Sequence, residues 1–258
     1  MKRLVVISDL HCGHRAGLTP PGYQYNDSEE GARAKYSMIQ RTMWDWYSKT
    51  ITELYPIDVL VVNGDAVDGK GDKSGGTELL DADRHAQVDM AIECIKKANA
   101  GQHFFTYGTA YHTGRDEDWE KVLAREFDSE IHSHLFMNIE GVIFDFKHKV
   151  GSSAIPHGRA TAPLRDKLWN VLWAERDLQP KANIIIRSHV HYFGVAGDSR
   201  GLVFTTPALQ GPGSKFGARE CSGTMDVGLM VFDCEDGIPH WSTRLCDLRI
   251  AADKAILI

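Results

Sequence analysis

The stretch that most constrains the fold is the apolar run Val59–Val62 together with the polar residues that follow it. The run is rich in β-branched side chains and passes directly into Asn63-Gly64-Asp65. A short apolar run that ends in Gly and Asp is typical of a buried strand leading into a loop. In open α/β sheets, ligands bind beyond the carboxyl ends of the strands. Asp65 and Asp68 are therefore candidate ligands, because two neighbouring carboxylates need a cation or a proton between them.

Other predicted strands also end in side chains that bind metals or move protons. The run Leu4–Ile7 precedes Asp9 and His11, and the run 103–107 leads into a loop that contains His112. The remaining such residues are His157, after a stretch at 134–155 expected to form two or three antiparallel strands, and His189 and His191, after the run 184–186. Because strands place their ends at the edge of a sheet, we expect these groups to converge although they lie far apart in the chain.

The rest of the pattern predicts an α/β protein with a single domain over residues 1–258. Helices are expected at 29–54, 79–100 and 116–127, and from Thr161, where Leu164, Leu168, Val171 and Leu172 are expected to face inward. Further strands are expected near 192–197, 201–206, 225–233 and 239–244, with a glycine-rich loop at 210–224. We expect two mixed sheets packed face to face with helices outside, a four-layer sandwich.

Composition excludes some classes of function. The chain has 258 residues and a net charge of −6, which disfavours a broad basic surface for nucleic acid. Its five cysteines are odd in number and form no C-x-x-C pair, so free thiols in a reducing compartment are expected. The N-terminal apolar run is too short for a signal peptide, and no run approaches the length of a membrane span. We therefore expect a cytoplasmic protein without a membrane partner.

The set of candidate ligands favours a pair of transition metals. Mixed imidazole and carboxylate ligands suit Mn, Fe, Zn, Ni or Co better than Ca or Mg. A single catalytic ion needs about three protein ligands, so six fit two ions that share a carboxylate. Paired ions about 3.5–4 Å apart stabilise both the attacking and the leaving oxygen in displacement at phosphorus.

The order of these motifs resembles the calcineurin-like metallophosphoesterases. The blocks are Asp9-x-His11, Gly64-Asp65-x-x-Asp68, the loop Gly108–His112, His157 and His189-x-His191, and they extend over residues 4 to about 210. The resemblance implies a metal-dependent phosphoesterase, in which a hydroxide that bridges two ions attacks a phosphomonoester or phosphodiester in line. Manganese is the favoured metal.

The resemblance also implies roles for single residues. It assigns metal 1 to Asp9, His11 and His191, metal 2 to His157 and His189, and the bridging position to Asp65. It makes His112 the general acid, oriented by Asp68, and a carboxylate beside an imidazole does raise its pKa and fix its tautomer.

Two departures from the family pattern concern the ligands of metal 2 and of the phosphate. The family's third block reads Gly-Asn-His with Asn as a ligand, whereas here Thr109 follows Gly108. The Thr109 hydroxyl, a backbone carbonyl or a water are the options for that ligand. The family's Arg after the second Asp is also absent, which leaves Lys70, Arg159 and Arg187 as candidates to bind the phosphate. The longer loop resembles that of metallophosphoesterases encoded by phages and prophages, which would place the protein in the host cytoplasm.

Two alternative functions remain open at this point. The glycine-rich loops could admit a longer substrate, as in a nuclease or a cyclic-nucleotide phosphodiesterase. A non-catalytic metal-binding scaffold with the same fold is the other alternative. The expected partner is a phosphoester, either a small molecule or a nucleic-acid end, and no stable protein partner is expected.

Overall fold

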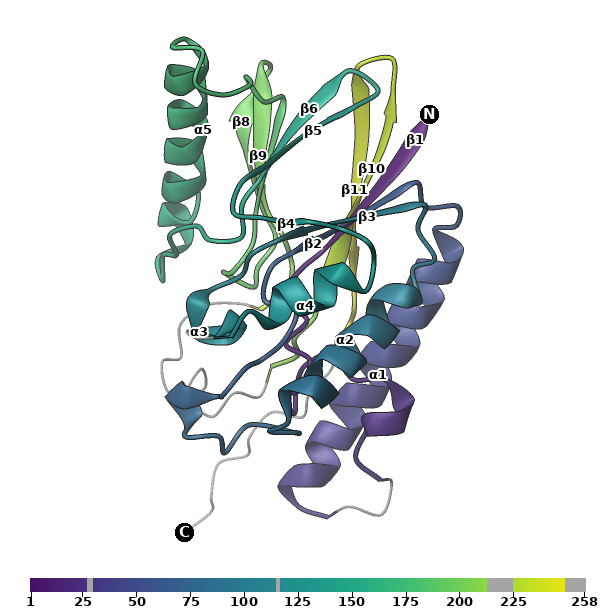
Figure 1. Cartoon of the computed structure of the whole chain (residues 1–258). Helices are drawn as coiled ribbons and strands as arrows, with labels where there is room; N and C mark the ends of the chain where they lie inside the picture. Colours follow the sequence, from purple (N-terminus) through teal and green to yellow (C-terminus); the bar gives the residue numbers. More distant parts are fainter. Residues whose placement is uncertain (27–29, 115–116, 213–224, 249–258) are drawn as a thin grey trace.

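Two β-sheets packed face to face, with helices on their outer sides, form the structure (Figure 1). This computed structural model describes residues 1–26, 30–114, 117–212 and 225–248. Most of the loop expected at 210–224 lies outside those residues. The predicted α/β sandwich of two mixed sheets with flanking helices is confirmed.

The first sheet has the strand order β11-β10-β1-β2-β3-β4. Its strands are β1 (Lys2–Ile7), β2 (Val59–Asn63), β3 (Gln102–Thr106), β4 (Ile131–His132), β10 (Gly228–Glu235) and β11 (Ile238–Leu245). Strands β1 to β4 run parallel, while β10 pairs antiparallel with both β1 and β11. The carboxyl ends of β1, β2 and β3 therefore lie at one edge.

The second sheet has the order β5-β6-β7-β9-β8. Its strands are β5 (Leu135–Ile139), β6 (Val142–Phe146), β7 (Ile184–Arg187), β8 (Gly194–Asp198) and β9 (Gly201–Thr205). Strands β6, β7 and β9 are parallel, and β5 and β8 pair antiparallel at the two edges.

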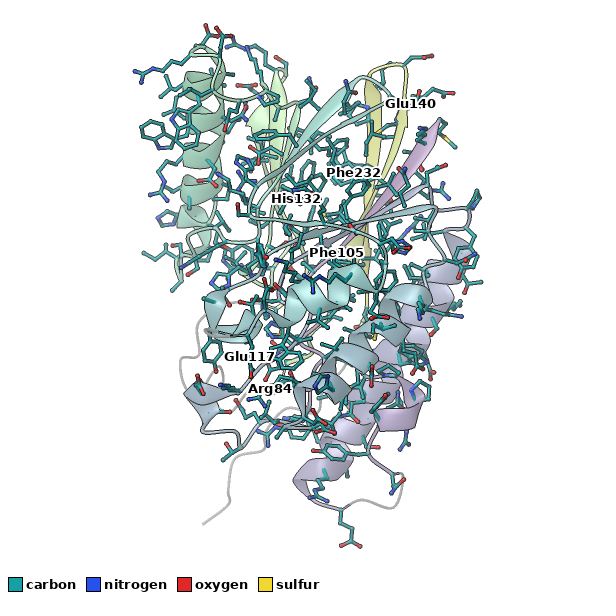
Figure 2. All side chains as sticks on the ribbon, in the orientation of Figure 1. Arg84, Phe105, Glu117, His132, Glu140 and Phe232 are labelled. Carbon is teal, nitrogen blue, oxygen red and sulfur yellow. The ribbon has the colours of Figure 1, made fainter. Side chains whose placement is uncertain are left out.

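Side-chain alternation along β1 divides the interior into two cores. Leu4 and Val6 lie in the core between the two sheets, whereas Val5 and Ile7 lie in the core beneath the helices. This is the period of two that a strand imposes when both of its faces are buried. Phe232 of β10 is fully buried in the core between the sheets (Figure 2).

The helices cover the outer faces of the sandwich. They are α1 (Ala32–Glu53), α2 (Arg84–Lys96), α3 (Ala110–Thr113), α4 (Trp119–Arg125) and α5 (Thr161–Ala174), with 3₁₀ turns η1 (Pro21–Tyr23), η2 (Asp72–Ser74) and η3 (Pro156–Gly158). Helices α1, α2 and α4 lie beside the first sheet, and α5 packs on β8 and β9 of the second (Figure 1). Among the described helices, none combines the length and the apolarity that crossing a bilayer requires.

Two predictions about the second sheet need correction. The stretch 134–155 contains two antiparallel strands, β5 and β6, which agrees with the expected number, but no strand follows Phe146 before residue 155, where the last one was expected to end. The predicted inward face of α5 is also wrong, because Leu164, Leu168 and Leu172 are 42–56% exposed. Helix α5 instead buries Pro163 and Asn170. Periodicity identified an apolar stripe, but it could not tell which side of the helix the sheet covers.

Candidate metal centre

Loops that follow β1, β2, β3, β6 and β7 bring seven metal-capable side chains together at one edge of the sandwich. They form three overlapping groups, which are Asp9, His11 and His191; Asp65, His148 and His189; and His11, Asp65 and His112. Within each group the potential ligand atoms lie within 4.8 Å of one another. His11 and Asp65 each belong to two groups, so the three sets form one centre.

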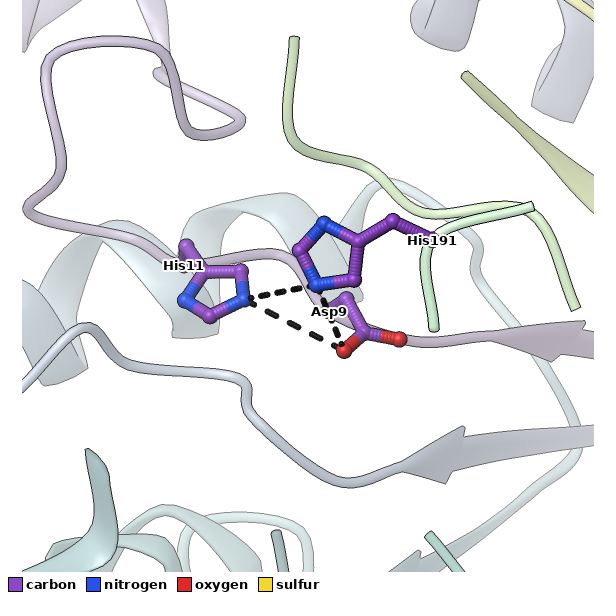
Figure 3. Close-up of side chains that lie close together, drawn as sticks. All are labelled: Asp9, His11 and His191. Carbon is purple, nitrogen blue, oxygen red and sulfur yellow. Dashed lines mark hydrogen bonds and ion pairs between the residues drawn. The ribbon is translucent and has the colours of Figure 1, made fainter. Parts of the chain in front are cut away.

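The first group joins the two sheets (Figure 3). Asp9 Oδ1 lies 3.1 Å from His191 Nε2 and 3.9 Å from His11 Nε2. The two imidazole nitrogens are 3.4 Å apart. The backbone N–H of His189 donates to Asp9 Oδ2 at 3.2 Å, which leaves Oδ1 to face the two rings.

The second group is centred on Asp65. Its Oδ2 atom lies 2.9 Å from His148 Nε2 and 3.9 Å from His189 Nδ1. His148 Nδ1 is 2.7 Å from the carbonyl oxygen of Asn63, so this nitrogen carries the proton and Nε2 faces the centre. His148 Nε2 also lies 3.9 Å from Asp9 Oδ1, which connects the second group to the first.

The third group places His112 against the same carboxylate. His112 Nε2 lies 4.0 Å from Asp65 Oδ2, and its ring meets that of His11 edge to face at 4.5 Å between centroids. His112 Nδ1 donates to the backbone carbonyl of Asp68 at 2.8 Å. The Asp68 carboxylate lies closer to His11 Nδ1, at 3.1 Å, than to His112 Nδ1, at 3.6 Å. Asp68 therefore orients His11 through its side chain and His112 mainly through its backbone.

Five of the metal-capable residues adopt left-handed backbone conformations. The φ angles are 51° for Asp9, 46° for His11, 50° for Asp65, 73° for His189 and 55° for His191. Non-glycine residues rarely adopt positive φ, and such conformations cluster at functional sites, where the surrounding structure maintains them. The chain turns sharply just after β1, β2 and β7 at these residues, which aims their side chains at a common point.

Two glycines allow the loops to approach this closely. A Cβ at Gly64 would lie 2.5 Å from His148 Nδ1, and a Cβ at Gly108 would lie 2.1 Å from Asp65 Oδ1. Neither contact is possible for a larger residue without moving a metal-capable side chain. The space at Gly108 lets the Thr109 N–H reach Asp65 Oδ1 at 2.6 Å.

Asp9, Asp65 and His148 shift one another's pKa values. Burial opposes ionisation of Asp9, but His191 and His148 outweigh it and hold the pKa of Asp9 below its ordinary value. Burial also opposes ionisation of Asp65, and His148 again lowers the pKa of that carboxyl. For His148, burial lowers the pKa, but Asp65 and Asp9 together raise it to about 10. Without a metal, an imidazolium therefore supplies the positive charge between the two carboxylates.

His11 has the opposite protonation preference. Burial and the nearby His112 lower the pKa of the His11 imidazole to about 4, although Asp68 acts in the other direction. His11 is therefore neutral at physiological pH. A neutral imidazole whose other nitrogen is bonded to a carboxylate is the usual arrangement of a metal-bound histidine.

Two buried atoms at the centre lack hydrogen bonds. Within the part of the chain that the structure describes, Asp9 Oδ1 and His148 Nε2 are both buried and make no well-aligned hydrogen bond, although Asp9 Oδ1 lies 3.1 Å from His191 and His148 Nε2 lies 2.9 Å from Asp65. Buried polar atoms are nearly always hydrogen bonded, so such exceptions require an explanation. A divalent cation among these groups would satisfy both, and mixed imidazole and carboxylate ligands suit transition metals. The residues present therefore fit divalent metal ions.

Glu120 at the start of α4 supports the centre, although no sequence pattern pointed to it. Its two carboxylate oxygens accept the N–H of Ala66 at 2.9 Å and of Gly108 at 2.7 Å. One buried side chain thus connects the loop after β2 to the loop after β3. Burial and the charge of Asp65 raise the pKa of Glu120 to about 7.

The main difference from the sequence prediction concerns the histidine of metal 2. His157 lies exposed in η3 and belongs to none of the groups found among the described residues. His148 occupies the place assigned to it, because β6 ends at Phe146 and not near residue 155. His148 follows the end of that strand by two residues, and this signal could have identified it.

Thr109 contacts the shared carboxylate, whereas Lys70 and Arg159 line two different cavities. The Thr109 hydroxyl lies 3.2 Å from Asp65 Oδ1 and 3.3 Å from Oδ2, so it hydrogen bonds to the shared carboxylate. Lys70 is exposed and lines a pocket beside His112. The Arg159 guanidinium lies 4.4 Å above the ring of Tyr192 and lines a separate cavity of about 250 Å³.

Arg187 does not bind phosphate in this arrangement. Its side chain is 2% exposed and is held by two carboxylates, Asp145 at 2.9 Å and Asp166 at 2.8 Å. A buried arginine with both partners in place is structural, because exposing it to substrate would leave two carboxylates unpaired. This prediction from the sequence is corrected.

Comparison with known proteins identifies the fold and no close relative. No family model and no curated protein matches the chain. The structure of Vps29 from Chaetomium thermophilum matches with a TM-score of 0.51 and 10% identity, over 95% of this chain and 97% of that one. A novel archaeal phosphodiesterase matches with a TM-score of 0.46 and 12% identity, over 94% and 99%. Vps29 complexed with Zn²⁺ from Entamoeba histolytica matches with a TM-score of 0.43 and 13% identity, over 95% and 99%. At these identities the first likeness shows the fold alone.

Proposed function

We propose that the protein is a metal-dependent phosphoesterase whose centre holds two divalent ions. The observation that carries this proposal is the convergence of three ligand groups on Asp65 and His11, with Asp9 Oδ1 and His148 Nε2 buried and without hydrogen bonds. One ion would be held by Asp9, His11 and His191, the other by His148 and His189, with Asp65 shared between them. When bound, such ions stabilise charge on phosphoryl oxygens and lower the pKa of water.

The chain's own residues would then orient and protonate the substrate. His112 carries a proton on Nδ1, fixed by the Asp68 carbonyl, and its Nε2 faces the centre. A proton on Nε2 would be transferred to the leaving oxygen as the bond to phosphorus breaks. The nearby Asp68 carboxylate would stabilise the doubly protonated ring. The overall reaction adds water across a P–O bond and yields an alcohol and a phosphate or phosphomonoester.

Of the three cations expected from the sequence to bind the phosphate, Lys70 fits this role best. It follows Asp68 by two residues and lines the pocket that reaches His112. Arg187 is committed to carboxylates, and Arg159 lies over Tyr192. We therefore assign phosphate binding to Lys70, together with the ions.

The test combines metal analysis with turnover of p-nitrophenyl phosphate and bis(p-nitrophenyl) phosphate. The protein should contain up to two transition-metal ions per chain, with manganese favoured, and should hydrolyse at least one of the two esters. Asp65→Asn should lose metal and turnover together, since it removes charge from the shared ligand. Preference for the diester would favour a phosphodiesterase or nuclease. Full metal occupancy with no rate above background on either ester would contradict catalysis and leave the scaffold alternative.

A further inference from the structure

A second cavity adjoins the centre on the other side of His112. It measures about 430 Å³, within the usual size range of small-molecule sites. The residues that characterise it are Lys70, Arg84, Tyr111, His112, Glu117 and Trp119. They come from the loop after β2, the start of α2, α3 and the segment that leads into α4. Arg84 and Glu117 are labelled in Figure 2, and both line the cavity.

The position of His112 relates this cavity to the leaving group of the substrate. His112 lines the cavity and also faces Asp65 at 4.0 Å. If His112 protonates the leaving oxygen, as the proposed function requires, the group attached to that oxygen must extend past His112. Because His112 lines the cavity, we take the leaving group to occupy it, and its walls would then determine which leaving groups are accommodated.

Two aromatic side chains give the cavity its chemistry. The Tyr111 ring meets the His112 ring edge to face at 4.5 Å. The Trp119 indole is fixed from two sides, since its Nε1 donates to Glu117 at 2.9 Å and His85 packs against its ring at 4.9 Å. Aromatic side chains held in this way stack with the flat faces of bases.

Charged groups at the rim add polar recognition. Arg84 and Glu117 supply a donor and an acceptor that could bond to the edge of a base. Lys70 also lines the cavity and follows Asp68 by two residues in the chain. A planar, polar-edged leaving group joined to a phosphate fits this combination better than an aliphatic alcohol does.

We infer that this cavity binds the nucleoside part of a nucleoside phosphate, so that the substrate class of the centre is nucleotides. The inference rests on the proposed function, because it takes His112 as the residue that faces the leaving group. Trp119 and Tyr111 act as specificity residues that hold the base.

The first experiment uses substrates that differ only in the base. The metal-loaded protein should hydrolyse adenosine 5′-monophosphate with a kcat/KM roughly tenfold or more above that for ribose 5-phosphate, as base stacking implies. Trp119→Ala and, separately, Tyr111→Ala should lower kcat/KM for adenosine 5′-monophosphate more than kcat/KM for ribose 5-phosphate, and so remove most of this advantage. Trp169→Ala, which changes an exposed tryptophan on α5, is the matched control and should keep the advantage.

The second experiment does not depend on hydrolysis. Titration calorimetry should detect adenosine binding to the protein, and Trp119→Ala should abolish it. Binding of adenosine without any turnover of phosphoesters would support the cavity and contradict the proposed function. Turnover of phosphoesters with equal kcat/KM for the two substrates, and no adenosine binding, would overturn the inference and leave the proposed function intact.

Discussion

At the scale of single residues, His148 is the side chain whose placement matters most. It contacts Asp65 at 2.9 Å and lies 3.9 Å from Asp9, so it reaches both halves of the centre. The sequence contained the signal, since His148 follows an aliphatic and aromatic run, but the stretch at 134–155 had no residue that fixed where pairing stops. The tendency to form a strand is a local property of the sequence, whereas the point at which strand pairing stops depends on partners from distant segments.

Variants of His148 and His157 should show which of the two histidines is a metal ligand. His148→Gln should reduce the metal content by up to one ion per chain and lower turnover more than the roughly 10- to 100-fold typical of losing an outer partner of a ligand. Metal analysis and p-nitrophenyl phosphate turnover measure the two effects. His157→Gln is the control, because this residue is exposed and should leave both quantities unchanged. Equal losses in the two variants would contradict the assignment.

The proton on His148 predicts how metal affinity depends on pH. Because Asp65 and Asp9, against the effect of burial, raise its pKa to about 10, an ion must displace this proton to bind Nε2. The apparent affinity for Mn²⁺ should therefore rise with pH, by up to tenfold per unit, until the pH approaches 10. Calorimetric titration at pH 6.5, 7.5 and 8.5 measures the slope. A pH-independent affinity would show that His148 is not a ligand.

The same proton has a consequence for the metal-free protein. A histidine whose folded pKa lies above its unfolded value contributes stability that is complete below the unfolded pKa and is lost as the pH rises through the folded pKa. For His148 this window runs from 6.5 to about 10. The free energy of unfolding of the chelated protein should fall across the window, and His148→Gln should show a smaller decrease when both are measured by urea denaturation.

At the scale of secondary structure, the loops after β2 and β3 depend on a carboxylate from α4. Glu120 accepts one N–H from each loop, and a carboxylate can do so with both of its oxygens. Glu120→Gln replaces one oxygen with an NH₂ group that faces an N–H donor. It should destabilise the protein by about 1–3 kcal/mol, as an unsatisfied buried group does, and should lower turnover by displacing Asp65 and Thr109.

The control for this variant lies on the same helix. Glu126 at the C-terminal end of α4 is exposed, so Glu126→Gln should change neither quantity measurably. Urea denaturation and kcat at saturating metal concentration separate the two effects. If Glu120→Gln retained full stability and full kcat, the two backbone hydrogen bonds would not hold the loops in place.

Elements with strong sequence signals were predicted within a few residues. The helix expected at 29–54 is α1 at Ala32–Glu53, and the buried strand expected from the run Val59–Val62 is β2 at Val59–Asn63. Short elements such as α3 and β4 have too few residues to form a periodic pattern. The exposed stripe on α5, which includes Trp169 and Trp173, shows that apolar periodicity does not guarantee burial.

At the scale of the whole molecule, the core between the sheets holds the two halves in register. Phe232 is fully buried and meets Phe144 at 5.3 Å and Phe204 at 5.5 Å, so it links β10 to β6 and β9 of the other sheet. Phe232→Ala should destabilise the protein by about 3–5 kcal/mol because it removes a buried aromatic ring and leaves a cavity. Urea denaturation measures this effect. Leu178→Ala, at a 70% exposed position, should change stability by less than about 0.5 kcal/mol.

Convergence of the motifs was predictable, but the division of roles among them was not. The sandwich architecture follows from buried strands and intervening helices, and the expected meeting of Asp9, His11, Asp65, His189 and His191 is what the structure shows. Side-chain partners such as Glu120 for the loops, or Asp145 and Asp166 for Arg187, arise from tertiary packing that carries no local pattern. A single sequence therefore indicated which side chains converge, but not the contacts that support them.

The ligands come from both sheets, with Asp9, His11 and Asp65 after strands of the first and His148, His189 and His191 after strands of the second. Each bound ion would then act as a reversible cross-link between two halves that otherwise adhere through an apolar core and a few hydrogen bonds, such as that from Asn63 to Ser188. Chelation should accelerate amide hydrogen exchange at the ligand-bearing ends of β1 and β7 more than at their opposite ends. The availability of metal ions would in this way affect how tightly the two sheets are held together as well as the reaction at the centre.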